Sequence, residues 1–71
     1  MIKEYRKIKN LTQENMSNYL QISLRQYQRI DKEEFMPRKK TLIEIFDLLE
    51  IPIHEQKEYI YSMWLKRKVD W

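Results

Sequence analysis

The sequence contains no glycine, no alanine and no cysteine, and it has a single valine and a single histidine, His54. Without glycine the chain cannot form a phosphate-binding P-loop or a dinucleotide-binding fingerprint, both of which need a backbone free of Cβ atoms. Without cysteine it cannot form disulfides or thiolate metal sites, and one imidazole excludes a site that needs two. Tight β-hairpins are also disfavoured, because their turns prefer glycine. We therefore expect an all-α protein that uses no metal and no other cofactor.

Long apolar stretches are missing as well. No run approaches the ~20 apolar residues that span a bilayer, and the N-terminus has no secretory apolar segment. The chain has 71 residues, of which 42% are apolar, and this is enough for one compact core. These features predict a single cytoplasmic domain over residues 1–71, with no membrane insertion and no evident small-molecule ligand.

Charge is distributed unevenly along the chain, although the net charge is only +3. Residues 1–10 and 24–40 are both basic, and each segment has a net charge of +3. Residues 41–60 carry five acidic side chains against one lysine, for a net charge of −4. This pattern is typical of a protein that turns a basic face to a polyanion and an acidic face away from it.

Apolar spacing and capping residues predict five short helices. Ile2, Tyr5 and Ile8 recur every three residues, which indicates a first amphipathic helix. Thr12 is a candidate N-cap for the second helix, and Ser23 is a candidate N-cap for the third.

Two capping boxes mark further helix starts. Gln26 follows Ser23 by three residues, and Glu44 follows Thr41 by three residues. Residues 32–40 are expected to form a loop, so that Thr41 caps the fourth helix. A last helix is expected from about His54 to Lys68. The inward stripes of these helices predict a core made of Met16, Leu20, Ile22, Tyr27, Ile30, Leu42, Ile45, Phe46 and Leu49.

Residues 11–30 combine two short amphipathic helices with a three-residue break, a pattern typical of a helix-turn-helix. The second of these helices turns Tyr27 and Ile30 inward. Arginine can bind guanine through two hydrogen bonds, and glutamine can bind adenine in the same way. No acidic residue between positions 15 and 30 repels phosphates. The outer face of this helix carries arginine and glutamine side chains that can bind bases in this way, on Arg25, Gln26, Gln28 and Arg29.

Four segments stand out by their joint spacing: Leu11-Thr12-Gln13-Glu14, Leu20-Gln21-Ile22-Ser23, Tyr27-Gln28-Arg29-Ile30-Asp31-Lys32, and Pro37 with Thr41-Leu42. Together they resemble the Cro/C1-type (XRE-like) helix-turn-helix family over roughly residues 2–53. The resemblance implies a compact five-helix, lambda-repressor-like fold. It also implies a transcriptional regulator of the phage, plasmid, restriction-modification or antitoxin kind, which binds a palindromic operator in double-stranded DNA as a homodimer.

The resemblance further implies which residues contact DNA. Gln13 becomes a phosphate contact at the start of the second helix, and about residues 23–32 become the helix that reads the major groove. The basic run at 38–40 becomes a phosphate clamp. The expected DNA-binding residues are thus Gln13, Ser23, Arg25, Gln26, Gln28, Arg29, Arg38, Lys39 and Lys40.

Two positions depart from the family pattern. Gln21 and Glu33 stand where the family often has glycine, in the turn and after the recognition helix. A left-handed backbone at either position costs roughly 1 kcal/mol for a residue other than glycine.

Other interpretations of the same residues stay open. Arg25 and Arg29 are also compatible with solvated helix charges, and Arg29 with an ion pair to Asp31 or Glu33. The basic residues of the first helix, Lys3, Arg6 and Lys7, are expected on a solvated face.

The classes of function that compete with DNA binding are few. An enzyme would need a nucleophile, a base and an orienting group, and the chain offers only scattered carboxylates, so we expect no catalysis. Interfacial membrane anchoring through Trp64 and the basic residues after it is a weak alternative. The main alternative is a protein-interaction module, such as an antirepressor or adaptor, that reuses the helix-turn-helix fold.

The C-terminal helix within residues 55–71 is expected to mediate dimerisation. Its apolar residues cover a sector of roughly 240°, whereas packing on one core needs only ~100°. Ile60, Met63 and Trp64 are expected to cover the core, which leaves Tyr61 and Leu65 exposed. The alternative is that all of them fold back on the first and fourth helices of a monomer. The expected interface comprises Tyr61, Trp64, Leu65, Val69 and Trp71. Trp64 is thus assigned both to the core and to the interface.

Overall fold

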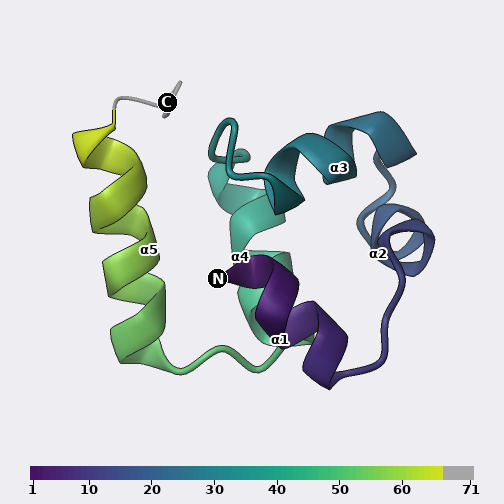
Figure 1. Cartoon of the computed structure of the whole chain (residues 1–71), viewed down its shortest axis with the longest axis horizontal. Helices are drawn as coiled ribbons and strands as arrows, with labels where there is room; N and C mark the ends of the chain where they lie inside the picture. The colour runs from purple at the N-terminus through teal and green to yellow at the C-terminus, as the bar shows by residue number, and fades with distance from the viewer. Residues whose placement is uncertain (67–71) are drawn as a thin grey trace.

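Five α-helices joined by short connections make up the part of the chain that the computed structural model describes, residues 1–66 (Figure 1). They are α1 (Ile2–Ile8), α2 (Gln13–Leu20), α3 (Leu24–Asp31), α4 (Lys39–Leu48) and α5 (Ile53–Leu65). The predicted all-α, five-helix fold is confirmed. None of these helices has the length and apolar character that crossing a membrane requires.

The helices surround one core. α1 and α4 lie in the middle of the molecule, with α2 and α3 on one side and α5 on the other (Figure 1). Of the nine predicted core residues, eight are buried, and the ninth, Ile22, is partly buried and packs against the core. Met36, Ile51 and Tyr59 are buried although the helix periodicity did not predict them. The expected stripe of α1 holds only in part, because Ile2 is buried but Ile8 is 74% exposed.

Side-chain caps begin α2 and α3 as predicted. The Thr12 hydroxyl accepts a hydrogen bond from the Asn15 backbone N–H at 3.0 Å, and the Asn15 side chain accepts one from the Thr12 N–H at 3.0 Å. Ser23 and Gln26 form the same reciprocal pair at the start of α3, with both bonds at 3.1 Å. These caps satisfy backbone donors that the first turn of a helix leaves without partners.

The predicted cap of α4 is wrong. The helix begins at Lys39, its N-cap is Arg38, and no side chain caps it. Thr41 lies inside the first turn, and the first helical bond runs from the Leu42 N–H to the Arg38 carbonyl at 2.9 Å. The loop between α3 and α4 is therefore shorter than the expected 32–40.

Four helices end in the left-handed conformation without a glycine. Asn10, Gln21, Glu33 and Glu50 have φ between 52° and 57°. The residue after each donates its N–H to a carbonyl five residues back, as in the Leu11 to Arg6 bond of 3.1 Å, which is the Schellman ending of a helix. Gln21 and Glu33, which stand where the family often has glycine, thus have a left-handed backbone. This conformation costs free energy in a residue other than glycine.

α5 differs from its prediction in part of the face that it buries. It begins at Ile53, next to the expected His54, and its described part ends at Leu65, while the expected end at Lys68 lies outside the described residues. Tyr59 and Met63 face the core, and the Tyr59 ring meets Phe46 edge-on at 6.0 Å between centroids. Trp64, which was expected to help cover the core, is 62% exposed.

Candidate nucleic-acid interface

The outer face of α3 is a surface of cations. Tyr27 and Ile30 are buried on the inner side of the helix. Because successive helical residues are about 100° apart, Arg25, Arg29 and Lys32 lie on the opposite side. All three are exposed, as a polyanion would require.

Lys32 is a member of this surface that the sequence prediction left out of its site residues. It is the C-cap of α3 and keeps helical backbone angles, with φ −80° and ψ 0°. Together with Arg25, Gln28, Arg29 and Glu34 it lines a shallow hollow of about 310 Å³. The signal in the sequence was its spacing, three residues after Arg29 and seven after Arg25.

Capping occupies part of the side chains at the start of α3. The Gln26 side-chain oxygen accepts hydrogen bonds from the Ser23 N–H at 3.1 Å and from the Ser23 hydroxyl at 3.3 Å. Reading adenine through two hydrogen bonds needs both the oxygen and the NH₂ group of a glutamine. While the cap is intact, Gln26 offers a base only its NH₂ group.

A buried ion pair joins α1 to the end of α3. Two nitrogens of the Arg6 guanidinium, Nε and Nη2, donate to Asp31 Oδ2 at 3.2 and 2.9 Å. Its third nitrogen donates to the Leu11 carbonyl at 2.8 Å. The Arg6 and Asp31 side chains are 9% and 2% exposed, so the expectation of a solvated Arg6 is wrong.

The same carboxylate also holds α2. The Gln13 amide donates to Asp31 Oδ2 at 3.1 Å, and the Gln28 amide donates to the Gln13 oxygen at 3.3 Å. Gln13 and Gln28, both predicted DNA contacts, are half-buried and bonded to each other. This chain of polar contacts fixes the angle between α2 and α3, which a helix-turn-helix needs in order to fit a groove.

Tyr27 is a core residue, as predicted. Burial, and after it the neighbouring Asp31 carboxylate, raise the pKa of the Tyr27 hydroxyl far above its usual value. Burial likewise raises the pKa of Tyr59. Both tyrosines are therefore neutral at physiological pH and add no charge to the core beneath α3 and α5.

Arg29 has a different partner from those expected. Its Nε donates to Glu34 Oε2 at 3.2 Å, and its guanidinium carbon lies 4.8 Å from the centroid of the Phe35 ring. The alternative of an ion pair to Asp31 or Glu33 is wrong. Asp31 points inward to Arg6, so it is not available on the outer face of α3.

The basic run at 38–40 forms the N-terminal end of α4. Arg38 and Lys40 are exposed, and Lys39 is exposed as well. Cations are unfavourable at a helix N-terminus, where the helix dipole is positive, and the first turn of α4 contains no acidic residue. Arg38 borders the same hollow of about 400 Å³ as Gln26, so this basic end lies beside α3. Together they present backbone and side-chain donors that suit phosphates.

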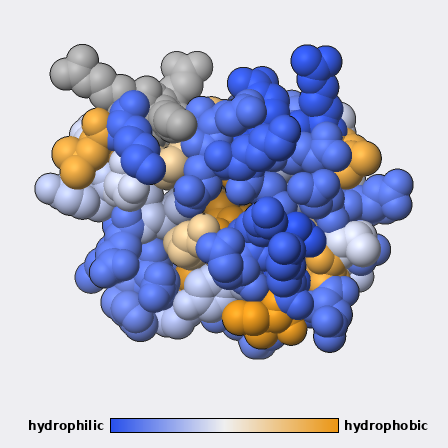
Figure 2. Space-filling model, viewed as in Figure 1, coloured by the Kyte–Doolittle hydropathy of each residue, from blue (hydrophilic) through white to orange (hydrophobic). Residues whose placement is uncertain are grey.

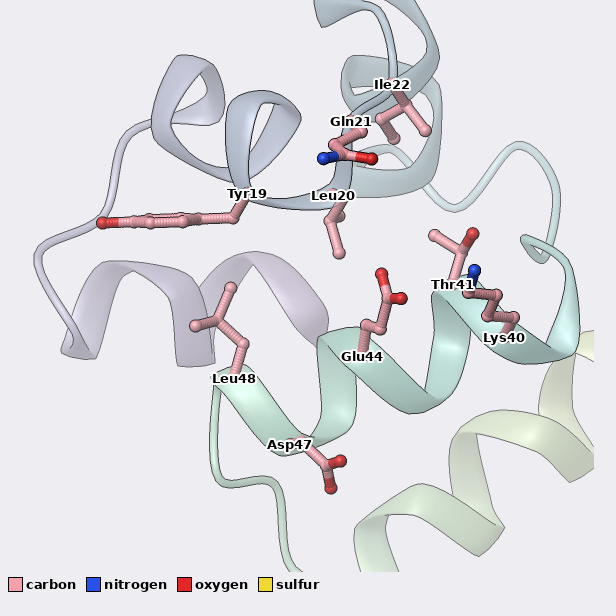
Figure 3. A pocket seen from close by; sticks show the side chains of 9 residues that line it. All are labelled: Tyr19, Leu20, Gln21, Ile22, Lys40, Thr41, Glu44, Asp47 and Leu48. Atoms are coloured by element: carbon pink, nitrogen blue, oxygen red, sulfur yellow. The ribbon is translucent and has the colours of Figure 1, made fainter.

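A groove of about 820 Å³ lies between α2 and α4. Figure 3 shows Tyr19, Leu20 and Leu48 on its apolar side and Glu44 reaching into it. Asp47 also lines the groove. Two carboxylates against the one lysine at position 40 disfavour a polyanion here, so the groove is not part of the basic surface.

A second exposed face, on α5, is apolar. Tyr61, Trp64 and Leu65 are each more than 60% exposed, as expected for an interface. In Figure 2 a small orange area and paler side chains lie near the C-terminal end of α5, and most of the rest of this view is hydrophilic with scattered orange areas. Val69 and Trp71, the other two expected interface residues, lie outside the described part of the chain.

Comparison with known proteins points to the same elements. A family model described as helix-turn-helix matches residues 2–56. Searches of curated proteins and of solved structures returned no match. The matched segment contains α1 to α4 and only the first residues of α5.

Proposed function

Because this chain belongs to the Cro/C1-type helix-turn-helix family of DNA-binding regulators, we propose that it controls transcription by reading a specific site in double-stranded DNA with α3. The observation that carries the proposal is the outer face of α3, where Arg25, Arg29 and Lys32 stand together opposite the core. An exposed helix with such a face fits the major groove, which is wide enough to admit it.

The proposed roles of the α3 residues differ. Arg25 and Arg29 read guanines, since each can donate two hydrogen bonds to one base edge. Gln28 and Gln26 contribute single contacts, because part of each side chain is bonded within the protein. Lys32 binds phosphate at the edge of the groove.

Phosphates on either side of α3 would be bound by the two neighbouring helix starts. At α2, a phosphate would be bound by the N–H groups of the first turn and by the amide hydrogen of Gln13 that is not donated to Asp31. At α4, Arg38, Lys39 and Lys40 supply charge. These contacts place the protein on the duplex and do not distinguish sequences.

We further propose that the protein acts as a homodimer held by the exposed face of α5. One helix reads only a short stretch of groove, and two copies related by a two-fold axis would read half-sites ~34 Å apart in a palindrome. Pairing of the two α5 faces would bury Tyr61, Trp64 and Leu65, residue types that are common in the centres of interfaces.

Selection of bound fragments from random duplex DNA tests the proposal. The expected result is one enriched, palindromic sequence, whose binding weakens linearly with the logarithm of salt concentration. A protein-interaction module would enrich no sequence, and that outcome would contradict the proposal.

A further inference from the structure

The end of α3 differs from the other three left-handed helix ends. After α1, α2 and α4 the residue that follows the left-handed one is apolar, namely Leu11, Ile22 and Ile51. Each of the three is buried or packs against the core, the usual place of this residue in a Schellman ending. At α3 the corresponding residue is Glu34, whose side chain is 48% exposed. The fold therefore does not require a carboxylate at this position.

Glu34 makes the same backbone bond as the residues at the other three ends, and its side chain also bonds to Arg29. Its backbone N–H donates to the Arg29 carbonyl at 3.1 Å, and its Oε2 accepts from Arg29 Nε at 3.2 Å. The Phe35 ring, 4.8 Å from the guanidinium carbon, supports the same group by a cation–π contact. The two contacts restrict the rotamers of a long side chain that would otherwise be free in solvent. They leave the two terminal nitrogens, Nη1 and Nη2, to bind another group.

A carboxylate is an unusual neighbour for a DNA-binding surface. Glu34 is the one acidic residue among those that line the hollow on the outer face of α3, in the described part of the chain. It weakens the attraction of this surface for phosphates, which contributes to binding of any sequence. Such a residue lowers the affinity for every DNA sequence but fixes an arginine that reads a base. It therefore increases the difference in affinity between the specific site and all other sequences.

We propose that Glu34 is a positioning residue for sequence recognition: it holds Arg29, against Phe35, in the orientation that reads a guanine. The inference rests on the proposed function. It assigns the discrimination between DNA sequences to Glu34 and Arg29 together and not to Arg29 alone.

Two substitutions of Glu34 separate positioning from charge. Glu34→Gln removes the charge but keeps an oxygen that accepts the Arg29 Nε–H. Glu34→Leu removes both and gives α3 the apolar residue that follows the other helix ends. Glu58→Gln, an exposed glutamate on α5, is the matched control for the change in net charge.

The experiment measures, for each variant, the ratio of affinities for the selected duplex and for a scrambled one. We expect the ratio to fall about tenfold for Glu34→Leu and to stay within about threefold of the parent for Glu34→Gln and for Glu58→Gln. Thermal melting of the free proteins checks folding. The NMR signal of the Arg29 Nε–H, protected in the parent, should be lost in Glu34→Leu and retained in Glu34→Gln.

The same variants in an Arg29→Ala background complete a double-mutant cycle. If Glu34 acts through Arg29, Glu34→Leu has no further effect on the ratio in that background. An equal loss there, or an unchanged ratio for Glu34→Leu alone, overturns the inference while the proposed function stands. A parent protein that selects no sequence overturns both.

Discussion

The outer faces of α3 and α5 are both exposed, but their chemistry is opposite. On α3 the exposed groups are Arg25, Arg29 and Lys32, and on α5 they are Tyr61, Trp64 and Leu65. Charged groups are well hydrated in the free protein and bind DNA by displacing its counterions. Apolar groups gain free energy only when another apolar surface covers them. We propose that these two faces serve different partners, a nucleic acid on α3 and a second copy of the chain on α5.

The two helices are also held in different ways. α5 packs mainly through Tyr59 and Met63, which are apolar contacts without a fixed direction. α3 is tied to α1 by the Arg6–Asp31 pair and to α2 by Gln13. Directional contacts define an angle, so the helix that we propose to fit a groove is held at a defined angle to α1 and α2. Substitutions in these two helices and around them test this comparison.

The buried pair is expected to have the largest effect. Asp31→Leu should destabilise the domain by about 3–5 kcal/mol, because it leaves the Arg6 guanidinium buried without its partner. Urea unfolding followed by circular dichroism measures this loss. The double variant Arg6→Met with Asp31→Leu should recover most of it, and Asp47→Asn, an exposed acid on α4, should change little. A single variant as stable as the parent would contradict the role given to the pair.

Removal of one base-reading group should cost less. Arg25→Ala is expected to weaken binding to the selected site by ~1–3 kcal/mol and to relax the preference at one base pair. Lys40→Ala, which removes a proposed phosphate contact, should instead weaken all sequences alike and lower the salt slope by about one. Fluorescence anisotropy on matched and mismatched duplexes distinguishes the two. Equal behaviour of the two variants would show that α3 does not read bases.

On α5 a charge in place of an apolar group should oppose self-association. Leu65→Glu is expected to raise the dissociation constant of the dimer at least tenfold, about 1.4 kcal/mol, because pairing would then bury a carboxylate. Analytical ultracentrifugation over a range of concentrations measures it. Ile8→Glu makes the same change at an exposed site on α1 and should leave the dimer intact. The α5 interface would be ruled out if Leu65→Glu dimerised as well as the parent.

One substitution at the start of α4 is expected to raise the stability of the domain and to lower its affinity for DNA. Arg38→Ser supplies the missing side-chain cap and should stabilise the domain by about 1 kcal/mol. It also removes a cation that we propose to bind phosphate, so affinity for DNA should fall for every sequence. Thermal melting measures the expected gain in stability, and fluorescence anisotropy on the same sample measures the expected loss of affinity for DNA. A variant that gains stability without losing affinity would place Arg38 away from DNA.

The smallest effect concerns the left-handed turn between α2 and α3. Gln21→Gly should stabilise the domain by roughly 0.5–1 kcal/mol, since glycine adopts positive φ without a steric penalty. Asn18→Gly, inside α2, should have the opposite sign by a similar amount. Neither change touches the outer face of α3, so affinity for DNA should stay the same. Denaturant midpoints compare the pair, and a destabilised Gln21→Gly would be the contrary result.

Short-range signals predicted much of the fold. The caps at Thr12 and Ser23 follow from side chains that bond to a backbone three residues away, so they depend on little else. The same signal failed at Thr41, because α4 extends one turn further toward Pro37 than its capping pattern indicates. A capping motif marks a possible start, and packing of the apolar stripe decides which start is used.

The long-range ion pair between Arg6 and Asp31 was not predicted, although the positions of the two residues in the sequence indicate that both are buried. Arg6 and Asp31 are 25 positions apart, and each lies four residues after a buried side chain, Ile2 and Tyr27. A charged residue on an inward stripe needs a buried partner. The sequence does not say which residue that partner is, since any acid on another inward stripe would serve.

On α5 the width of the apolar sector was informative but its orientation was not. Exposure of Tyr61 and Leu65 is confirmed. Because about two thirds of the helix circumference is apolar, no single direction stands out as inward, and Tyr59 occupies the core side in place of Trp64. The docking of α5 on Phe46 decides this, and that contact belongs to tertiary structure.

An NMR titration of the protein with its selected duplex tests the division between the two faces most directly. We expect large shifts for the side-chain N–H signals of Arg25 and Arg29 and for the backbone at Lys32 and Lys40. At protein concentrations at which the dimer is already formed, we expect Tyr61 and Leu65 not to respond to DNA. Shifts confined to α5, with the α3 signals unchanged at saturating duplex, would contradict this division.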